Sequence, residues 1–305
     1  MPSPRVLRIA RVGLTVADLS AMRAFYEAGL GFTSVSEETR AGPAFGALTG
    51  LEGASARAAV LQLSGVEIEL LAFDPPGRPY PQLRAANDPW FQHFAVAVAD
   101  MPAAYATLSE QAQAPISDGG PQLLPPSTGS VTAYKFRDPE GRPLELSYNP
   151  AETQAPLPGS PFLRVDHSAI AVRDLEAGVA FYTGVLGMRV EARLLNTGPT
   201  QARLDGLPDP QVDIVVLTPD PPVVEGRSGP HLELLHYRTP VSPAAPIAPQ
   251  PNDLAATRLV LQVDDLDGMI ARARETGAKV VSRAFVDRRA LIRDPDRHLL
   301  ELVQG

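Results

Sequence analysis

The sequence repeats itself at an interval of 156 residues, and this repeat is the strongest constraint on the fold. The segments RIARVGLTVADL (8–19) and RVDHSAIAVRDL (164–175) match at the arginine, at the alternating apolar positions and at the final Asp-Leu pair. The segments RDPEGRPLEL (137–146) and RDPDRHLLEL (293–302) recur at the same interval. Because both halves carry one pattern, we expect two copies of one fold unit.

Proline-rich stretches divide each half again. They cover residues 74–89, 149–161 and 239–251, and they are typical of extended linkers because proline fixes φ and cannot donate to a strand ladder. We therefore predict an N-terminal domain (5–150), a linker (151–161) and a C-terminal domain (162–304). Their four modules are predicted at residues 5–75, 88–150, 162–240 and 254–304.

Every module has the same order of patterns. An alternating strand leads to an aspartate that can cap a helix, then to a helical stripe, and then to three short strand-like runs. The stripe predicts a helix face packed on a sheet, with the hydroxyl groups of Tyr26 and Tyr182 at its rim. Its members are Leu19, Met22, Tyr26 and Leu30; Met101, Ala104, Tyr105 and Leu108; Leu175, Val179, Tyr182 and Leu186; and Leu266, Met269, Ile270 and Ala273.

Each module also carries two polar residues on the sheet face that points away from its helix. One lies in the first strand, and the other is a glutamate between apolar residues in the last strand. Strand alternation turns both toward the same side of the sheet. The four pairs are Arg11 with Glu69, His93 with Glu145, His167 with Glu233, and Arg258 with Glu301.

Composition excludes several classes of protein. The net charge of -8 and the scattered basic residues oppose binding to nucleic acid or to an anionic membrane. The chain has no cysteine, so any metal must bind to histidines and carboxylates. The N-terminus lacks the pattern of a signal peptide, and no apolar run is long enough for a membrane span. We therefore expect a cytoplasmic protein.

The repeated β-α-β-β-β unit, the early histidine, the Asp-Leu, Phe-Tyr and Leu-Gly landmarks and the Asp-Pro turn resemble the vicinal oxygen chelate superfamily. This superfamily includes glyoxalase I, extradiol dioxygenases and bleomycin-resistance proteins. The resemblance covers the chain from about Arg5 to Gln304. It implies an α+β fold in which four βαβββ modules form two paired half-barrel sheets with helices on the outside. It also implies that two paired modules supply their four polar residues to one metal ion.

The pairing of the modules decides which metal site is complete. If consecutive modules pair, each site holds one histidine, one arginine and two glutamates, and the arginine repels a divalent cation. If the second module joins the third, as in glyoxalase I, the resemblance implies a metal site of His93, Glu145, His167 and Glu233. The outer pair then forms a degenerate second site without metal, held by salt bridges between Arg11, Glu69, Arg258 and Glu301. Only this exchanged pairing accounts for all eight residues.

The resemblance implies one divalent cofactor (Ni, Zn, Co, Mn or Fe(II)) and a small-molecule substrate for a monomer or homodimer. The favoured activity is proton transfer through an enediolate, of the lyase or isomerase type, with Glu145 and Glu233 as candidate bases. An Fe(II) extradiol dioxygenase with His93, His167 and Glu145 as ligands is the second alternative. It is disfavoured because Lys135 stands where that family has a tyrosine, with Tyr134 one residue away. A non-catalytic, ligand-sequestering protein of the resistance type is the third.

Two further expectations concern the surroundings of the site. His231 shares a strand face with Glu233, so it either lines the cavity or, as we expect, lies exposed at the edge of the sheet. The loops at 42–53 and 122–130 are expected to determine which substrate binds.

Overall fold

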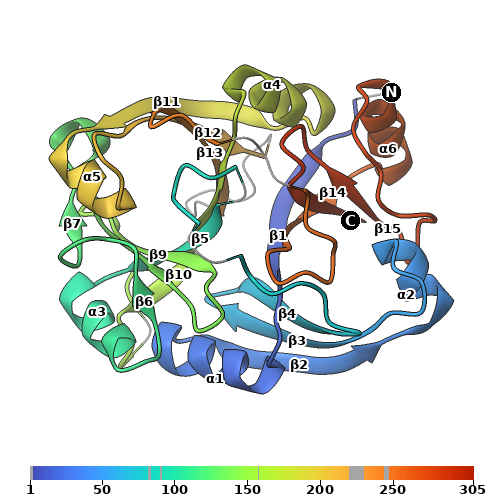
Figure 1. Ribbon diagram of the computed structural model, residues 1–305, viewed down its shortest axis with the longest axis horizontal. Helices are drawn as coiled ribbons and strands as arrows, with labels where there is room; N and C mark the ends of the chain where they lie inside the picture. Colours follow the sequence, from blue (N-terminus) through green and yellow to red (C-terminus); the bar gives the residue numbers. More distant parts are fainter. Residues whose placement is uncertain (1–2, 82–83, 90, 157, 220–229, 244–246) are drawn as a thin grey trace.

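The computed structural model describes residues 3–81, 84–89, 91–156, 158–219, 230–243 and 247–305, which form two open, curved sheets (Figure 1). Helices lie against the convex faces, and neither sheet closes into a barrel. The predicted α+β fold of paired half-barrels is thus confirmed. No helix among the described residues is both long and apolar enough to cross a membrane.

The first sheet combines the first and fourth modules. Its strand order is β15-β16-β14-β1-β4-β3-β2, and β1 and β14 run antiparallel at the seam between the modules. The strands are β1 (Val6–Thr15), β2 (Thr33–Arg40), β3 (Ser55–Leu63), β4 (Val66–Asp74), β14 (Thr257–Val263), β15 (Arg289–Arg293) and β16 (Leu299–Gln304).

The second sheet combines the second and third modules. Its order is β11-β12-β13-β10-β5-β9-β8-β6, with β7 also paired to β8 and an antiparallel β10–β5 seam. The strands are β5 (Gln92–Val98), β6 (Ala114–Pro115), β7 (Gln122–Leu123), β8 (Thr132–Arg137), β9 (Pro143–Tyr148), β10 (Phe162–Ala171), β11 (Arg189–Thr197), β12 (Gln211–Thr218) and β13 (His231–Thr239). The pairing of the modules is therefore the exchanged one.

The helices begin where the capping pattern predicts. Asp18, Asp100, Asp174 and Asp265 each accept a backbone N–H bond at the start of a helix. These helices are α1 (Leu19–Leu30), α3 (Met101–Ser109), α4 (Leu175–Ala180) and α6 (Leu266–Glu275), and α4 continues as a π-helix over Phe181–Val185. Two further short helices, α2 (Gly42–Thr49) and α5 (Pro199–Asp205), and a 3₁₀ turn (Pro126–Thr128) lie in the loops.

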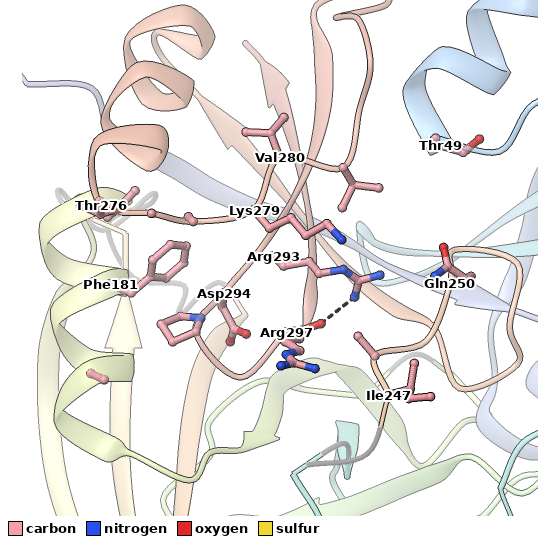
Figure 2. A pocket seen from close by; sticks show the side chains of 18 of the residues that line it. Thr49, Phe181, Ile247, Gln250, Thr276, Lys279, Val280, Arg293, Asp294 and Arg297 are labelled. Carbon is pink, nitrogen blue, oxygen red and sulfur yellow. Dashed lines mark hydrogen bonds between the residues drawn. The ribbon is translucent and has the colours of Figure 1, made fainter.

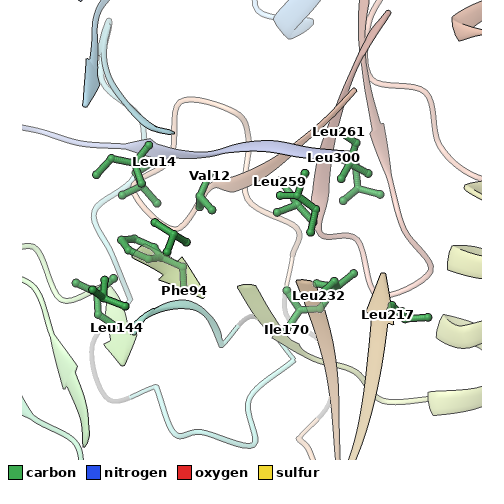
Figure 3. Close-up of a cluster of buried hydrophobic side chains, with 14 of the residues drawn as sticks. Val12, Leu14, Phe94, Leu144, Ile170, Leu217, Leu232, Leu259, Leu261 and Leu300 are labelled. Atoms are coloured by element: carbon green, nitrogen blue, oxygen red, sulfur yellow. The ribbon is translucent and has the colours of Figure 1, made fainter. Parts of the chain in front are cut away.

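The main core lies between the two sheets. The predicted helical stripes supply part of it, and only Tyr105 and Leu175 of those residues are partly buried rather than buried. Apolar side chains of both sheets meet there: Val12, Leu14, Leu259, Leu261 and Leu300 belong to the same cluster as Phe94, Leu144, Ile170, Leu217 and Leu232 (Figure 3). Because leucines beside each terminal glutamate fill this core, the glutamates are turned to the concave faces.

Two sequence expectations were wrong. The hydroxyls of Tyr26 and Tyr182 do not lie at a rim; both are buried and donate to Asp138 Oδ2 and Asp294 Oδ2, each at 3.1 Å. The fourth module does not have three strands after its helix. Among its described residues an isolated bridge between Val280 and Ile292 precedes the hairpin of β15 and β16.

Candidate metal centre

His93 and His167 meet on the concave face of the second sheet. They lie on β5 and β10, the two strands of the seam, where Ala95 faces His167 and Ala169 faces His93. The small alanines leave room for both rings, whose centroids are 5.8 Å apart. Both side chains are buried.

Glu145 joins the two histidines from the next strand. It lies on β9 beside Ala95 of β5, and its Oε2 is 3.3 Å from His93 Nε2. His93, Glu145 and His167 each offer one ligand atom, and the three atoms lie within 4.8 Å of one another. Imidazole nitrogens and a carboxylate oxygen are the donors that divalent transition metals use in proteins.

Glu233, on β13, lies beside this set but is not part of it. Its Oε2 is 3.8 Å from His167 Nε2, and its Oε1 is 3.3 Å from His231 Nε2. His231 is not the exposed edge residue that we expected, because it is partly buried and lines the same cavity. The cavity has a volume of about 230 Å³.

A carboxylate orients His167 from behind. Asp166 Oδ2 lies 3.1 Å from His167 Nδ1, so the Nε2 atom is left facing the cavity. Asp166 also accepts from Arg164 Nη2 at 2.9 Å. Strand alternation would turn Asp166 to the opposite face, but the β5–β10 register shifts between Val165 and His167, and this irregularity brings the two side chains together.

Lys135 is a buried cation next to the proposed ligands. Its Nζ lies 3.9 Å from Glu145 Oε2 and donates to Asp205 Oδ1 at 2.7 Å. Asp205 Oδ2 accepts further bonds from Gln201 Nε2 at 2.8 Å and from the Tyr237 hydroxyl at 3.2 Å. Lys135 therefore has a closer carboxylate partner in Asp205 than in Glu145, and Glu145 remains free to bind a cation.

The two histidines have opposite pKa shifts. Burial lowers the pKa of His93, although its hydrogen bond to Glu145 opposes this change. Burial also disfavours the charged form of His167, but Glu233 and Asp166 outweigh it and raise the pKa of His167 to about 9. Burial raises the pKa of Glu233, yet the charge of His167 and the contact with His231 reverse the shift and bring it to about 2.

These residues fit a divalent ion. The donors are two imidazoles and two carboxylates, of which His93, Glu145 and His167 are buried and Glu233 is partly buried, and His93 Nδ1 has no hydrogen-bond partner. An uncompensated buried polar atom costs free energy. This cost is removed if the His93 ring rotates so that Nδ1 finds a partner, or if a metal ion binds to the ring and holds it in such an orientation.

The outer four residues form a different structure on the first sheet. Glu69 accepts from Arg11 Nη1 at 3.1 Å and from Arg258 Nη2 at 2.8 Å, and Arg258 Nε lies 3.3 Å from Glu301 Oε2. Gly13, which faces Arg258 across the seam, leaves the space for its guanidinium, because a Cβ atom there would lie 2.5 Å from Arg258 Nη2.

Two arginines that the sequence analysis missed complete this arginine cluster. Arg40 Nη2 donates to Glu69 Oε1 at 2.7 Å, and Arg289 forms an ion pair with Glu301. The cavity beside them is only about 10 Å³. Phe45, Leu48 and Thr49 of α2 line it, so the 42–53 segment does not contact the metal centre, whereas Leu124 and Thr128 of the 122–130 segment do line the 230 Å³ cavity.

Paired βαβββ modules that gather histidines and glutamates on a concave sheet define a protein of the vicinal oxygen chelate type. The chain belongs to the Glyoxalase/Bleomycin resistance protein/Dioxygenase superfamily, whose family model matches residues 8–146 and again residues 164–302. No curated protein matches the sequence.

Two solved structures share the whole architecture. Glyoxalase I from Zea mays superposes with a TM-score of 0.61 at 17% identity, over 99% of this chain and 92% of that one. A protein from Bacillus subtilis that is provisionally described as a dioxygenase superposes with a TM-score of 0.56 at 12% identity, over 98% of this chain and 86% of that one. Identities this low establish the fold alone.

Proposed function

We propose that this protein is a metal-dependent enzyme of the glyoxalase type. It chelates vicinal oxygens of a small substrate and transfers a proton between adjacent carbons through an enediolate. The observation that carries the proposal is the buried donor set of His93, Glu145 and His167, with Glu233 beside it, at the wall of a 230 Å³ cavity.

His93, His167 and Glu145 would hold the ion, which is one of Ni, Zn, Co, Mn or Fe(II). When bound, a divalent ion supplies polarisation of a substrate carbonyl and stabilisation of the negative charge that forms on the vicinal oxygens. The Asp166 carboxylate keeps the His167 ring in the orientation that this role requires.

Glu233 is the better candidate for the base. It lies outside the three-residue donor set, so its carboxylate is available to accept a proton. The contact between His231 Nε2 and Glu233 Oε1 at 3.3 Å positions its carboxylate. Glu145 is held by His93 and lies near Lys135, so it is less free to move a proton.

Lys135 supplies a positive charge on the cavity wall. It faces Glu145 across the β8–β9 ladder, and Leu291 stands opposite Glu301 in the corresponding place of the arginine cluster. An ammonium at this position favours substrates that carry, or develop, a negative oxygen. The cavity volume restricts them to small molecules, since pockets for drug-sized ligands measure roughly 300–1,000 Å³.

An Fe(II) extradiol dioxygenase is the second candidate. Two histidines and one carboxylate on one side of an ion are the ligand set of non-haem iron oxygenases, and His93, His167 and Glu145 match it. In that case Glu233 has no role as a base.

The test combines metal analysis with one substitution. Protein purified without chelator is expected to carry about one divalent ion per chain. His93→Ala is expected to lose this ion. The control is His236→Gln, which is expected to keep the ion because His236 lies on the same strand as Glu233 but does not line the cavity. Activity is then screened with thiol adducts of 2-oxoaldehydes and, by oxygen uptake, with catechols.

Glu233→Gln separates the candidates. It is expected to lower kcat for proton transfer by about 10²- to 10⁴-fold while the metal stays bound. Catechol-dependent oxygen uptake that survives this substitution would favour the dioxygenase. Metal-free protein without any turnover would instead favour the ligand-sequestering alternative.

A further inference from the structure

A second and larger cavity lies away from the metal centre. Its volume is about 1040 Å³, and it is formed by the ends of α2 and α4 with the π-helix, by residues 276–283, and by the turn at 293–297. Figure 2 shows Phe181 and Asp294 on one side of this cavity, Thr49 and Gln250 on the other, and the Lys279 and Arg293 side chains between them. None of the proposed metal-site residues lines it.

Its lining is basic, although the whole chain has a net charge of -8. The basic residues are Lys279, Arg283, Arg293 and Arg297, and the single acidic residue of the lining is Asp294. The Asp294 carboxylate is engaged elsewhere, since it accepts from the Tyr182 hydroxyl at 3.1 Å and from the backbone N–H of His298 at 2.8 Å. Among the described residues it forms no ion pair with a cation of the lining, although its charge acts on Arg293 from a longer distance.

Within the described residues, three of the four cations have no carboxylate within ion-pair distance. Arg293 is buried, and its guanidinium donates to two carbonyl oxygens, those of Arg297 at 2.7 Å and Pro249 at 2.6 Å. Lys279 and Arg297 form no ion pair there, and only Arg283 has a partner, Glu52 at 3.6 Å. Unneutralised cations that share one cavity repel each other unless an anion joins them.

The internal repeat supplies a matched comparison. Ser117 Oγ donates to the carbonyl of Leu204 in α5 and accepts from the backbone N–H of Lys135. Ser282 Oγ likewise donates to the carbonyl of Leu48 in α2 and accepts from the backbone N–H of Leu291. The segments around the two serines therefore correspond. By this correspondence Lys279 replaces Ala114, Arg283 replaces Asp118, and Arg297 replaces Gly141. Only Arg293 has a basic counterpart, Arg137, which bonds the carbonyls of Gly141 and Arg84.

Arg297 occupies a position that suits glycine. Its φ is 73°, in the left-handed region, and its counterpart Gly141 has a φ of 94°. A non-glycine residue there costs of the order of 1 kcal/mol. The fourth module therefore keeps a guanidinium at the cavity in spite of backbone strain that the second module avoids.

Part of the remaining wall is apolar. Phe181, Val280 and Ile247 contribute hydrocarbon surface opposite and beside the cations (Figure 2), and Val185 of the π-helix also lines the cavity. Planar guanidinium groups bind phosphate and carboxylate oxygens, often with two hydrogen bonds. A ligand that satisfies both parts of the cavity has at least two negative charges and an apolar body.

We propose that this cavity is a binding site for a small organic polyanion, a phosphate ester or a polycarboxylate, held by Lys279, Arg283, Arg293 and Arg297. The site is distinct from the metal centre and does not depend on the activity proposed for it. The counterparts of three of its four cations in the second module are Ala114, Asp118 and Gly141, so one such ligand is expected to bind per chain.

Calorimetric titration with AMP, inorganic pyrophosphate and citrate tests this proposal. At least one probe is expected to bind with a dissociation constant below about 1 mM at low ionic strength, and more weakly as salt rises, because salt screens exposed charges. Phosphate probes and citrate distinguish the two classes of anion. AMP that binds more tightly than the more highly charged inorganic pyrophosphate indicates a contribution from the apolar wall, and adenosine, which has no charge, is expected not to bind.

Two substitutions replace cavity residues with those found at the corresponding positions of the second module, Ala114 and Gly141. Lys279→Ala with Arg297→Gly is expected to raise the dissociation constant at least about tenfold. Arg297→Gly also relieves the strained φ, so its melting temperature is expected not to fall. Arg57→Ala with Arg23→Ala, on β3 and α1 and outside the cavity, removes the same two positive charges and is expected to bind as the unchanged protein does.

The proposal is overturned if none of the three anions binds at about 5 mM. It is also overturned if the Lys279→Ala, Arg297→Gly variant and the Arg57→Ala, Arg23→Ala control alter binding equally, because that result would reflect net charge rather than a site.

Discussion

Arg258 donates from Nη2 to Glu69 Oε2 at 2.8 Å, across the seam that corresponds to the His93–His167 seam of the other sheet. Both side chains are almost fully buried, at 3% and 0% exposure. A buried ion pair contributes little net stability, but removal of one partner leaves an uncompensated buried charge. The arginine cluster is therefore expected to hold the first and fourth modules together only as a complete set.

We predict that Arg258→Ala lowers the free energy of unfolding by about 3–5 kcal/mol. The measurement is urea denaturation followed by circular dichroism, on protein whose metal content is determined in parallel and is expected to be unchanged. Arg23→Ala, which breaks an exposed contact with Glu37, is the control and is expected to change stability little. Equal losses in the two variants would contradict the prediction.

A second prediction concerns restoration of the degenerate site. Arg11→His with Arg258→His recreates the residue types of the metal centre, two histidines and two glutamates. We predict that this variant still binds one divalent ion per chain, because Arg40 and Arg289 remain paired with Glu69 and Glu301. The number of ions is counted by elemental analysis, and two ions per chain would show that the two additional arginines do not matter.

The repeat allowed the fold to be predicted, but it did not allow every contact of the site to be predicted. His93, Glu145, His167 and Glu233 have fixed places in the module pattern, so alternation alone turns them to the concave face. Asp166 has no such rule, because it reaches His167 only through a shift in strand register. The partner of Lys135 was hidden for another reason: Asp205 belongs to α5, and its counterpart in α2 is Thr49, so the repeat indicates no carboxylate there.

The Phe-Tyr pairs illustrate the limit of helix periodicity. The spacing predicts that Tyr26 and Tyr182 belong to the core, and both are buried. It does not reveal that each hydroxyl group needs a partner there, and the partner comes from the Asp-Pro turn of the next module. These two bonds link modules that are consecutive in the chain, while the sheets link modules that are not.

Our third prediction compares these two tyrosines. Tyr182→Phe is expected to destabilise the protein by about 2 kcal/mol, and Tyr26→Phe by about 1 kcal/mol, measured by urea denaturation. Asp138 Oδ2 keeps a bond from Arg142 Nη1 at 2.9 Å when Tyr26 loses its hydroxyl. Asp294 has no such arginine, since His298 stands at the corresponding position and turns its ring to the carbonyl of Ala171. A larger loss for Tyr26→Phe would contradict this account.

The fourth prediction is that metal affinity rises with pH. Without metal, the pKa of His167 is raised to about 9, since Glu233 and Asp166 outweigh the effect of burial. An imidazole must lose its proton before it can bind a metal ion. The dissociation constant, measured by competition with a chelator, is therefore expected to fall about tenfold for each pH unit between about 6 and 8 and to level off above about 9.

The same raised pKa gives the metal-free protein the opposite pH dependence. His167 binds its proton more tightly in the folded chain than in the unfolded chain, so its stabilising contribution is complete below the ordinary histidine pKa of about 6.5 and is lost as the pH rises through about 9. Asp166→Asn removes one of the charges that raise this pKa. This substitution is expected to shift the pH dependence of metal affinity and that of the stability of the metal-free protein to lower pH. If neither shifts, the role of the contact between Asp166 and His167 in raising this pKa is refuted.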